Sequence, residues 1–217
     1  MKLSILLSSL FTLTTISSFA QVSYNFKAGV GLPTWSHKNR EMIIENDDVQ
    51  YGSNYEKSKT GTVTSFYINA NASYNLKSNF AVQAGIGLEG RGGRIPQAEY
   101  KANYMFVNVP VNLLYYIPTG PIGSAFVSAG PYAGINFGGK YTASNGEGGT
   151  YTEDMDYGKN MQLKRFDWGI NWGLGYKFTK GYIISANYNL GLYNMGTLGQ
   201  YEKLHSRGFS FGIGYEI

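Results

Sequence analysis

Cysteine is absent from the 217 residues, and histidine occurs only twice. The lack of cysteine excludes a disulfide scaffold, a thiolate zinc site, a cysteine nucleophile and a lipid-anchored N-terminal cysteine. Charge is also scarce, at 15% of residues, and the basic side chains are scattered singly, which argues against nucleic-acid binding. After the first twenty residues there is no long apolar run, so no membrane-spanning helix is expected.

What the chain has instead is glycine and aromatic residues. It contains 29 Gly, 19 Tyr and 12 Phe, and its aromatic content is 16%. This composition excludes a coiled coil or an ordinary helix bundle and favours strands and turns. The length fits one domain with a sizeable core.

The first twenty residues have the pattern of a secretory signal peptide. Lys2 gives a positive start, an uncharged and largely apolar stretch follows, and Ser18 and Ala20 are small residues suited to cleavage after Ala20. The stretch is too short for a spanning helix. We therefore predict a signal peptide at 1–20 and a mature domain at 21–217.

Apolar and polar residues alternate with a period of two, the pattern of strands with two unlike faces. In 164–178 the apolar face includes Phe166, Trp168 and Trp172, whereas the other face includes Asp167 and Asn171. Eight segments show this alternation: 22–32, 62–76, 80–91, 103–117, 125–137, 164–178, 182–194 and 207–217.

Short and long links between these segments follow one another strictly. The links around 77–79, 118–123 and 179–181 are tight turns by composition, and those at 33–61, 92–102, 138–162 and 195–206 are longer. This order is typical of outer-membrane barrels. We predict an all-β fold: an eight-stranded, antiparallel, up-and-down transmembrane β-barrel of the bacterial outer membrane, with short periplasmic turns and long extracellular loops.

The alternative is a soluble eight-stranded cup with its apolar face inward. The polar face, however, consists mostly of Gly, Asn and Ser, which suit a narrow interior better than a charged exterior. Aromatic residues gather near the strand ends, as in the two interfacial girdles of a membrane barrel. The predicted girdle residues are Tyr74, Phe80, Tyr115, Phe137, Phe166, Trp168, Tyr176, Phe178, Tyr182, Phe209 and Tyr215.

Several charged residues share the predicted interior face, where an unpaired charge is strongly unfavourable. This lumen charge network consists of Lys27, Glu89, Arg91, Arg165, Asp167, Lys177 and Glu216. We expect it to fill the barrel, so that no open diffusion pore remains.

A family resemblance is carried by four stretches of the sequence: 109–116, 130–134 after the following turn, 166–169 with 173–176, and the closing stretch 212–215. They resemble the PorT-type outer-membrane β-barrel family of Bacteroidetes. The resemblance implies an outer-membrane location and a single small barrel. It implies little chemistry, because most members have no known activity and some take part in protein secretion.

Few residues suggest catalysis. Ser36-His37 lies in the first long link and His205-Ser206 in the last, with Asp47, Asp48 or Glu202 available to orient an imidazole. Solvated loop histidines are the commoner explanation, and solvated acids are likewise the commoner explanation for the candidate calcium ligands at 45–48 and 153–156. We expect no enzyme activity, cofactor or metal.

The predicted role is therefore that of a structural or interaction protein acting through its extracellular loops. The alternatives are a small conduit or secretion-associated component and, third, a hydrolase or acyltransferase at the rim. Expected partners are outer-membrane lipid and lipopolysaccharide, the barrel-assembly machinery and a possible protein at the loops, with no nucleic acid and a monomeric state. The lysines expected near lipopolysaccharide phosphates are Lys57, Lys59, Lys101, Lys140, Lys159 and Lys203.

Overall fold

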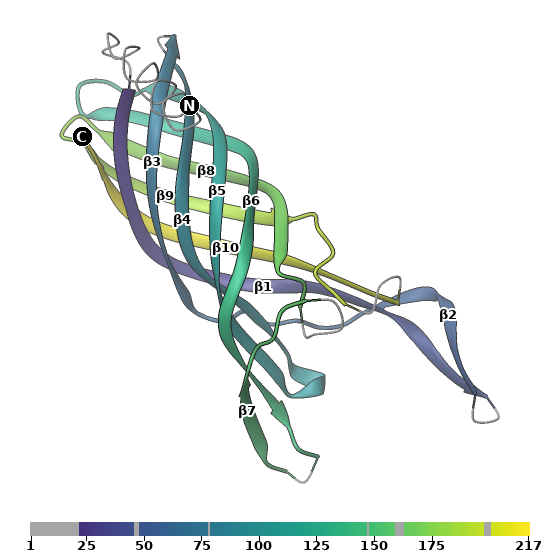
Figure 1. Ribbon diagram of the computed structural model, residues 1–217. Helices are drawn as coiled ribbons and strands as arrows, with labels where there is room; N and C mark the ends of the chain where they lie inside the picture. Colours follow the sequence, from purple (N-terminus) through teal and green to yellow (C-terminus); the bar gives the residue numbers. More distant parts are fainter. Residues whose placement is uncertain (1–21, 46–47, 78, 147, 159–162, 198–200) are drawn as a thin grey trace, which may run out of the picture.

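The computed structural model describes residues 22–45, 48–77, 79–146, 148–158, 163–197 and 201–217, so the predicted signal peptide at 1–20 lies outside the described residues. Eight antiparallel strands form a ring (Figure 1). They are β1 (Val22–Glu45), β3 (Ser65–Lys77), β4 (Phe80–Ile95), β5 (Tyr100–Pro118), β6 (Gly123–Ser144), β8 (Phe166–Phe178), β9 (Tyr182–Gly191) and β10 (Glu202–Glu216).

Each ring strand pairs with its neighbours in chain order, and β10 pairs with β1 to complete the circuit. In this closing seam, residues from Asn25 to Asn39 face residues from Glu216 to Glu202. The tight turns that follow β3, β5 and β8 lie at one end, the turn rim, and the longer links lie at the other end, the loop rim. The described residues contain no helix that is long and apolar enough to cross a membrane.

All four long links differ from the prediction, because strand structure extends into each of them; in the last, β10 already begins at Glu202. β1 runs on to Glu45 and pairs with β2 (Asp48–Lys57), and β6 runs on to Ser144 and pairs with β7 (Thr150–Asp154). The predicted link at 92–102 shrinks to the short helix η2 (Pro96–Ala98) and Glu99. The β1–β2 and β6–β7 hairpins project beyond the loop rim (Figure 1).

The alternation in sequence places apolar side chains outside the ring and most polar ones inside it. Along β10, the exposed fractions of Phe209, Phe211 and Ile213 are 55%, 53% and 71%. Inside the ring, Asn25 and Ser73 are each 1% exposed, and Asp167 is fully buried. This distribution is the reverse of that in a soluble protein.

Large aromatic side chains also lie in the interior of the barrel, at places where a glycine of a neighbouring strand leaves room for them. A Cβ atom added to Gly134 would come within 2.7 Å of the Phe106 ring, and one added to Gly175 within 2.5 Å of the Phe126 ring. Two buried apolar clusters result. The turn-side cluster consists of Ala81, Leu114, Phe126 and Ile183, and the loop-side cluster consists of Trp35, Ala102, Tyr104, Tyr141, Met155, Leu163, Met195 and Leu204.

Candidate functional site

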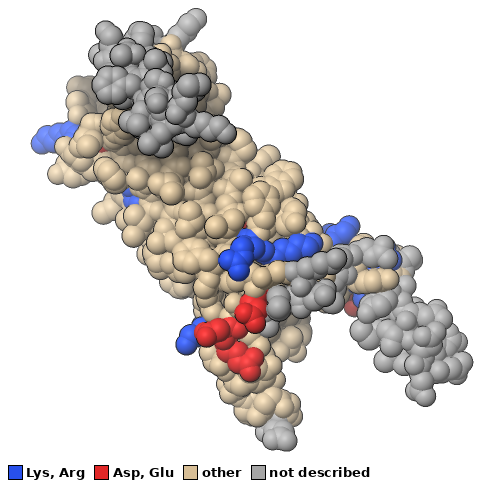
Figure 2. Space-filling model, in the orientation of Figure 1, with Lys and Arg blue, Asp and Glu red and all other residues tan. Residues whose placement is uncertain are grey.

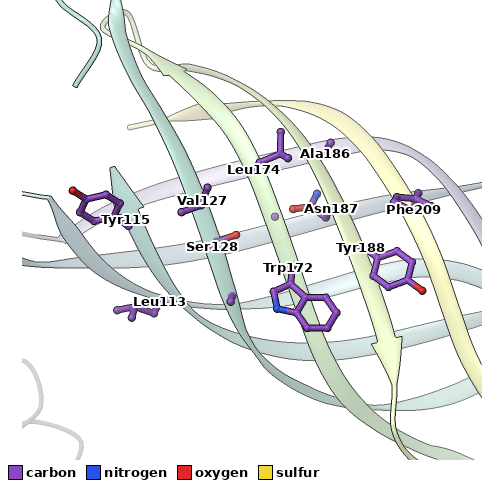
Figure 3. A pocket seen from close by; sticks show the side chains of 12 residues that line it. Leu113, Tyr115, Val127, Ser128, Trp172, Leu174, Ala186, Asn187, Tyr188 and Phe209 are labelled. Atoms are coloured by element: carbon purple, nitrogen blue, oxygen red, sulfur yellow. The ribbon is translucent and has the colours of Figure 1, made fainter. Parts of the chain in front are cut away.

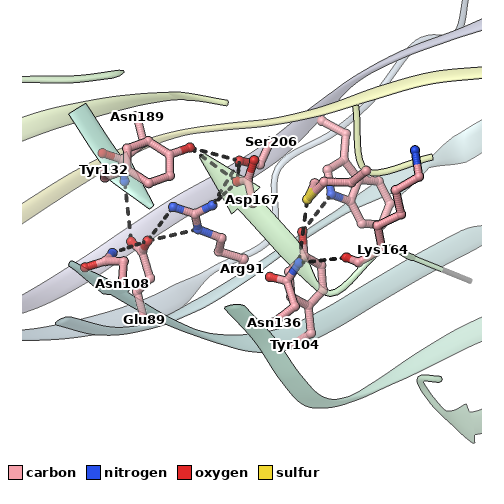
Figure 4. Close-up of polar contacts among 12 residues, drawn as sticks. Glu89, Arg91, Tyr104, Asn108, Tyr132, Asn136, Lys164, Asp167, Asn189 and Ser206 are labelled. Atoms are coloured by element: carbon pink, nitrogen blue, oxygen red, sulfur yellow. Dashed lines mark hydrogen bonds and ion pairs between the residues drawn. The ribbon is translucent and has the colours of Figure 1, made fainter. Parts of the chain in front are cut away.

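The interior between the two apolar clusters is organised around Arg91 on β4 (Figure 4). Its guanidinium is 2.7 Å from Glu89 Oε1 and 2.5 Å from Asp167 Oδ2, and it stacks on the ring of Phe106 with its Cζ 3.6 Å from the centroid. Arg91 is 4% exposed. One cation therefore bridges two acidic groups across the ring, from β4 to β8.

Neutral side chains complete the hydrogen bonds of these acids. Asn108 donates to Glu89 Oε1 over 2.9 Å, and the Ser206 hydroxyl donates to Asp167 Oδ2 over 2.9 Å. Tyr132 also donates its hydroxyl hydrogen to Asp167, over 3.3 Å. The parts played by Asn108, Tyr132 and Ser206 were not predicted, because each is a neutral residue that lies far from its acidic partner in the chain.

The other predicted members of the lumen charge network occupy different places. Lys177 pairs with Glu216 near the turn rim, and Lys27 is buried with its ammonium 5.4 Å from the centroid of the Phe126 ring. The prediction that Arg165 belongs to the lumen charge network is wrong. Its side chain is exposed, and its Cζ lies 5.6 Å from the centroid of the Tyr157 ring. β8 begins one residue later, at Phe166, so Arg165 stands above the ring and outside the network.

A small polar cavity lies below Glu89, bounded mainly by asparagine and serine side chains. Its volume is about 50 Å³, which is room for a few water molecules and not for a continuous channel. Within the described part of the chain, the amide oxygens of Asn108 and Asn112 are buried without a hydrogen-bond partner. Water is the group that fits both the size and the acceptors.

The loop-side cluster closes the other end of the interior. Trp35 is 3% exposed, stacks on Tyr104 and donates its indole hydrogen to the Tyr104 hydroxyl over 3.3 Å. Burial raises the pKa of Tyr100 to about 12, with further contributions from Tyr141, Glu202 and Tyr151. The Tyr100 phenol is therefore neutral at physiological pH, and its ring packs against the apolar plug.

His37, above this plug, contacts two polar side chains from distant segments. Its Nε2 is 3.0 Å from Glu202 Oε1 on β10, and its Nδ1 is 3.1 Å from the Ser58 hydroxyl just after β2. Serine, histidine and glutamate are thus joined in a row, as in a hydrolytic triad. His37 and Glu202 were among the predicted rim residues, whereas Ser58, which is 21 residues from His37 in the chain, was not.

The other predicted rim residues are arranged differently. Ser36 faces His205 across the closing seam and is buried, whereas Ser206 belongs to the Arg91 network. Asp47 lies outside the described residues. Among the residues that the structure describes, no group of three or more His, Asp or Glu side chains is placed to hold a metal ion.

Most predicted girdle residues lie on the outer wall. Tyr176 and Phe178 are partly buried, in contact with each other, and the remaining nine are exposed. The exposed residues are Tyr74, Phe80, Tyr115, Phe137, Phe166, Trp168, Tyr182, Phe209 and Tyr215. Phe80 packs on Tyr115, with ring centroids 4.8 Å apart.

The same outer wall has a shallow apolar hollow of about 560 Å³ (Figure 3). Trp172 and Tyr188 stack beside it, with ring centroids 6.2 Å apart, and Leu174, Leu113 and Phe209 contribute further apolar surface. The hollow faces away from the interior network. An apolar concavity of this kind suits hydrocarbon rather than a polar solute.

The model of the outer membrane protein beta-barrel domain family matches residues 17–196. Among solved structures, the outer membrane protein OprG from Pseudomonas aeruginosa aligns with a TM-score of 0.51 at 12% identity, covering 91% of this chain and 96% of that one. Ail, the attachment invasion locus protein of Yersinia pestis, aligns with a TM-score of 0.42 at 12% identity, covering 91% and 99%.

The outer membrane protease OmpT from Escherichia coli aligns with a TM-score of 0.43 at 10% identity, covering 92% of this chain and 98% of that one. At such identities the likeness concerns the fold alone. No curated protein matches the sequence.

Proposed function

The chain belongs to the outer membrane protein beta-barrel domain family and lies in the bacterial outer membrane, and from this premise we propose that it is a non-enzymatic barrel with a filled interior. Its role is structural or interactive, and it is exercised through the strands and hairpins above the loop rim. The finer assignment to PorT-type barrels, which rests on the sequence resemblance, is part of this proposal.

The observation that carries the proposal is the packing of the interior. An ion-paired Arg91 spans the ring, and apolar clusters lie on both sides of it. A solute would have to separate buried charges from their partners, which costs several kcal/mol per ion. Transport through the ring is therefore disfavoured.

The two hairpins supply the surface for interaction. β1–β2 and β6–β7 extend past the ring and are held as paired strands rather than as loose loops. The described side chains of β7 are exposed, with Tyr151 43% exposed, and Thr142 and Thr152 hydrogen-bond across the strand pair over 2.9 Å. Such preformed strands bind a partner at a low entropic cost.

A planar-bilayer recording tests the filled interior. We expect the purified protein to give no steady conductance, and an Arg91→Ala variant to give openings if the network is the barrier. Steady conductance from the unmodified protein would overturn the proposal in favour of the small conduit or secretion-linked component.

The row of Ser58, His37 and Glu202 favours a second candidate function, a hydrolase or acyltransferase at the rim. One feature argues against it: the Ser58 backbone N–H donates to the His37 carbonyl over 3.1 Å and is thus not free to stabilise an oxyanion. A fluorophosphonate probe separates the two functions. Labelling that is lost in Ser58→Ala and reduced in Glu202→Gln would establish the enzyme, and absence of labelling supports the non-enzymatic role.

A further inference from the structure

A row of three lysines crosses the outside of the closing seam just above the ring. Lys38 on β1 faces Lys203 on β10 in one direction and Lys57 on β2 in the other. Directly opposed residues on paired strands have Cβ atoms about 5 Å apart, and like charges in such positions are destabilising. All three lysines are exposed.

Acidic residues of the same strands lie on the opposite face. The next register row joins Asn39 to Glu202 on one side and to Glu56 on the other. Because adjacent residues of a strand point to opposite faces, these carboxylates lie on the face opposite the lysine row. In the described part of the chain no ion pair involves any of the three lysines.

Two arginines extend the row into a basic strip, which we define as Lys38, Arg40, Lys57, Lys203 and Arg207. The Nε atoms of Arg40 and Arg207 are buried without a hydrogen-bond partner among the described residues. The Tyr55 ring lies beneath two of the cations, with Lys203 Nζ 4.3 Å and Arg40 Cζ 5.4 Å from its centroid. The strip thus gathers five basic side chains on one face, and the Nε–H groups of its two arginines have no acceptor among the described residues.

The electrostatic effect of the strip is apparent at His205, which lies between Arg207 and Lys203 on the outer face of β10. The pKa of His205 is lowered, first by burial and then by Arg207, with Lys203 and Lys38 acting in the same direction and Asp167 opposing them. Cations from both strands of the seam therefore act on one point. In Figure 2, several basic side chains lie at the level where the ring passes into the hairpins, and the main group of acidic side chains in view lies toward the β6–β7 hairpin, next to a further basic one.

The height of the strip identifies the kind of anion that fits it. Arg207 follows directly above Phe209, the last exposed aromatic residue on the outer face of β10. At about 3.3 Å per residue and a strand tilt of about 40°, Arg207 lies about 5 Å and Lys203 about 15 Å above Phe209 along the membrane normal. With Phe209 taken as the interface, Arg207 lies within a headgroup layer of about 5–8 Å, and the lysine row lies about 7–10 Å above that layer, at a height that only a larger, sugar-containing headgroup reaches.

We propose that the basic strip binds the phosphorylated headgroup of an outer-leaflet glycolipid, as in lipopolysaccharide. The phosphates lie between the lysines, accept hydrogen bonds from the two arginines and relieve the repulsion across the seam. The proposal rests on the proposed function only in placing the loop rim at the outer leaflet. It adds the residues that bind the lipid.

The test uses the full mature protein in detergent micelles, with bisphosphorylated lipid A, dephosphorylated lipid A and inorganic phosphate as separate probes. We expect salt-sensitive binding of the bisphosphorylated lipid alone. The triple variant Lys38→Gln/Lys57→Gln/Lys203→Gln should lose at least tenfold in affinity, and about 100-fold if each lysine contributes as a basic residue near an anionic surface does. The control, Lys77→Gln/Lys180→Gln, removes charges beside the tight turns at the opposite rim and should lose less than threefold.

A second readout distinguishes a binding site from a general charge effect. Without lipid A, Lys38→Gln should raise the thermal unfolding midpoint, because it removes a charge that opposes two others. With bisphosphorylated lipid A, the same variant should show a smaller stabilisation than the wild type. The proposal is overturned by equal losses in the triple variant and its control, by a lowered midpoint in lipid-free Lys38→Gln, or by equal protection from inorganic phosphate.

Failure here is distinguishable from failure of the proposed function. Lipid affinity and bilayer conductance are separate measurements on the same protein. If the protein conducts and the triple variant still loses affinity for lipid A, the filled interior is refuted and the basic strip is supported. If the protein does not conduct and the triple variant keeps its affinity, the basic strip is refuted and the filled interior is supported.

Discussion

Replacing Arg91 with methionine tests the interior network most directly. The change keeps much of the side-chain volume but removes the cation from between Glu89 and Asp167, of which Asp167 is fully buried. Removing one partner of a buried ion pair costs about 3–5 kcal/mol, because the remaining charge stays desolvated. We therefore expect Arg91→Met to lower the free energy of unfolding by about 3–5 kcal/mol.

The assay is urea-induced unfolding in lipid vesicles, followed by tryptophan fluorescence, with refolding curves to establish equilibrium. The decisive comparison is a triple variant, Glu89→Gln/Arg91→Met/Asp167→Asn, in which no charge of the cluster remains. It should recover at least half of the loss, because neutral amides are cheaper to bury than unpaired carboxylates. A single variant within 1 kcal/mol of the wild type, or a triple variant no more stable than the single one, would refute the electrostatic account.

Three other predictions concern packing and pH. Gly175→Ala should cost about 1–3 kcal/mol in the same unfolding assay, because its Cβ would lie 2.5 Å from the Phe126 ring. Gly31→Ala, whose Cβ would meet nothing closer than 3.7 Å, should stay within about 1 kcal/mol, and equal costs would contradict the packing argument. Trp35→Ala should cost about 3–5 kcal/mol, since Trp35 is 3% exposed within the loop-side cluster, and a cost below 1 kcal/mol would show that the cluster is not a plug. Burial raises the pKa of Tyr100 to about 12 in the folded state, above the ordinary value of 10.0. Stability present below pH 10 should therefore fall between about pH 10 and 12, and less steeply in Tyr100→Phe.

The period of two was sufficient to predict the ring strands. It works where one face meets lipid and the other a polar interior, as along Phe166–Phe178, where apolar and polar residues separate cleanly. Beyond the membrane both faces of a strand are polar, so the alternation disappears. For that reason β2 and β7 were expected to be loops.

The two segments in which the alternation is least regular are those whose strands carry aromatic side chains in the interior. Phe106 and Phe126 are apolar residues at inward positions, and they disturb the pattern in 103–117 and 125–137. Their places depend on glycines of neighbouring strands, which no local pattern discloses. Ser58 likewise reaches His37 only because the β1–β2 hairpin folds back, and Arg165 fell outside the network because one residue of register decides whether a side chain enters the ring.

The closing seam makes ring closure chemically detectable. Lys38 and Lys203 meet only when the last strand has joined the first, after nearly the whole chain has been delivered to the membrane. An assembly intermediate without β10 lacks Lys203 and Arg207 and leaves one edge of β1 unpaired. Affinity for the glycolipid would then distinguish closed barrels from incompletely assembled ones. Because the lipid would bind the closed state alone, it would also stabilise that state by mass action.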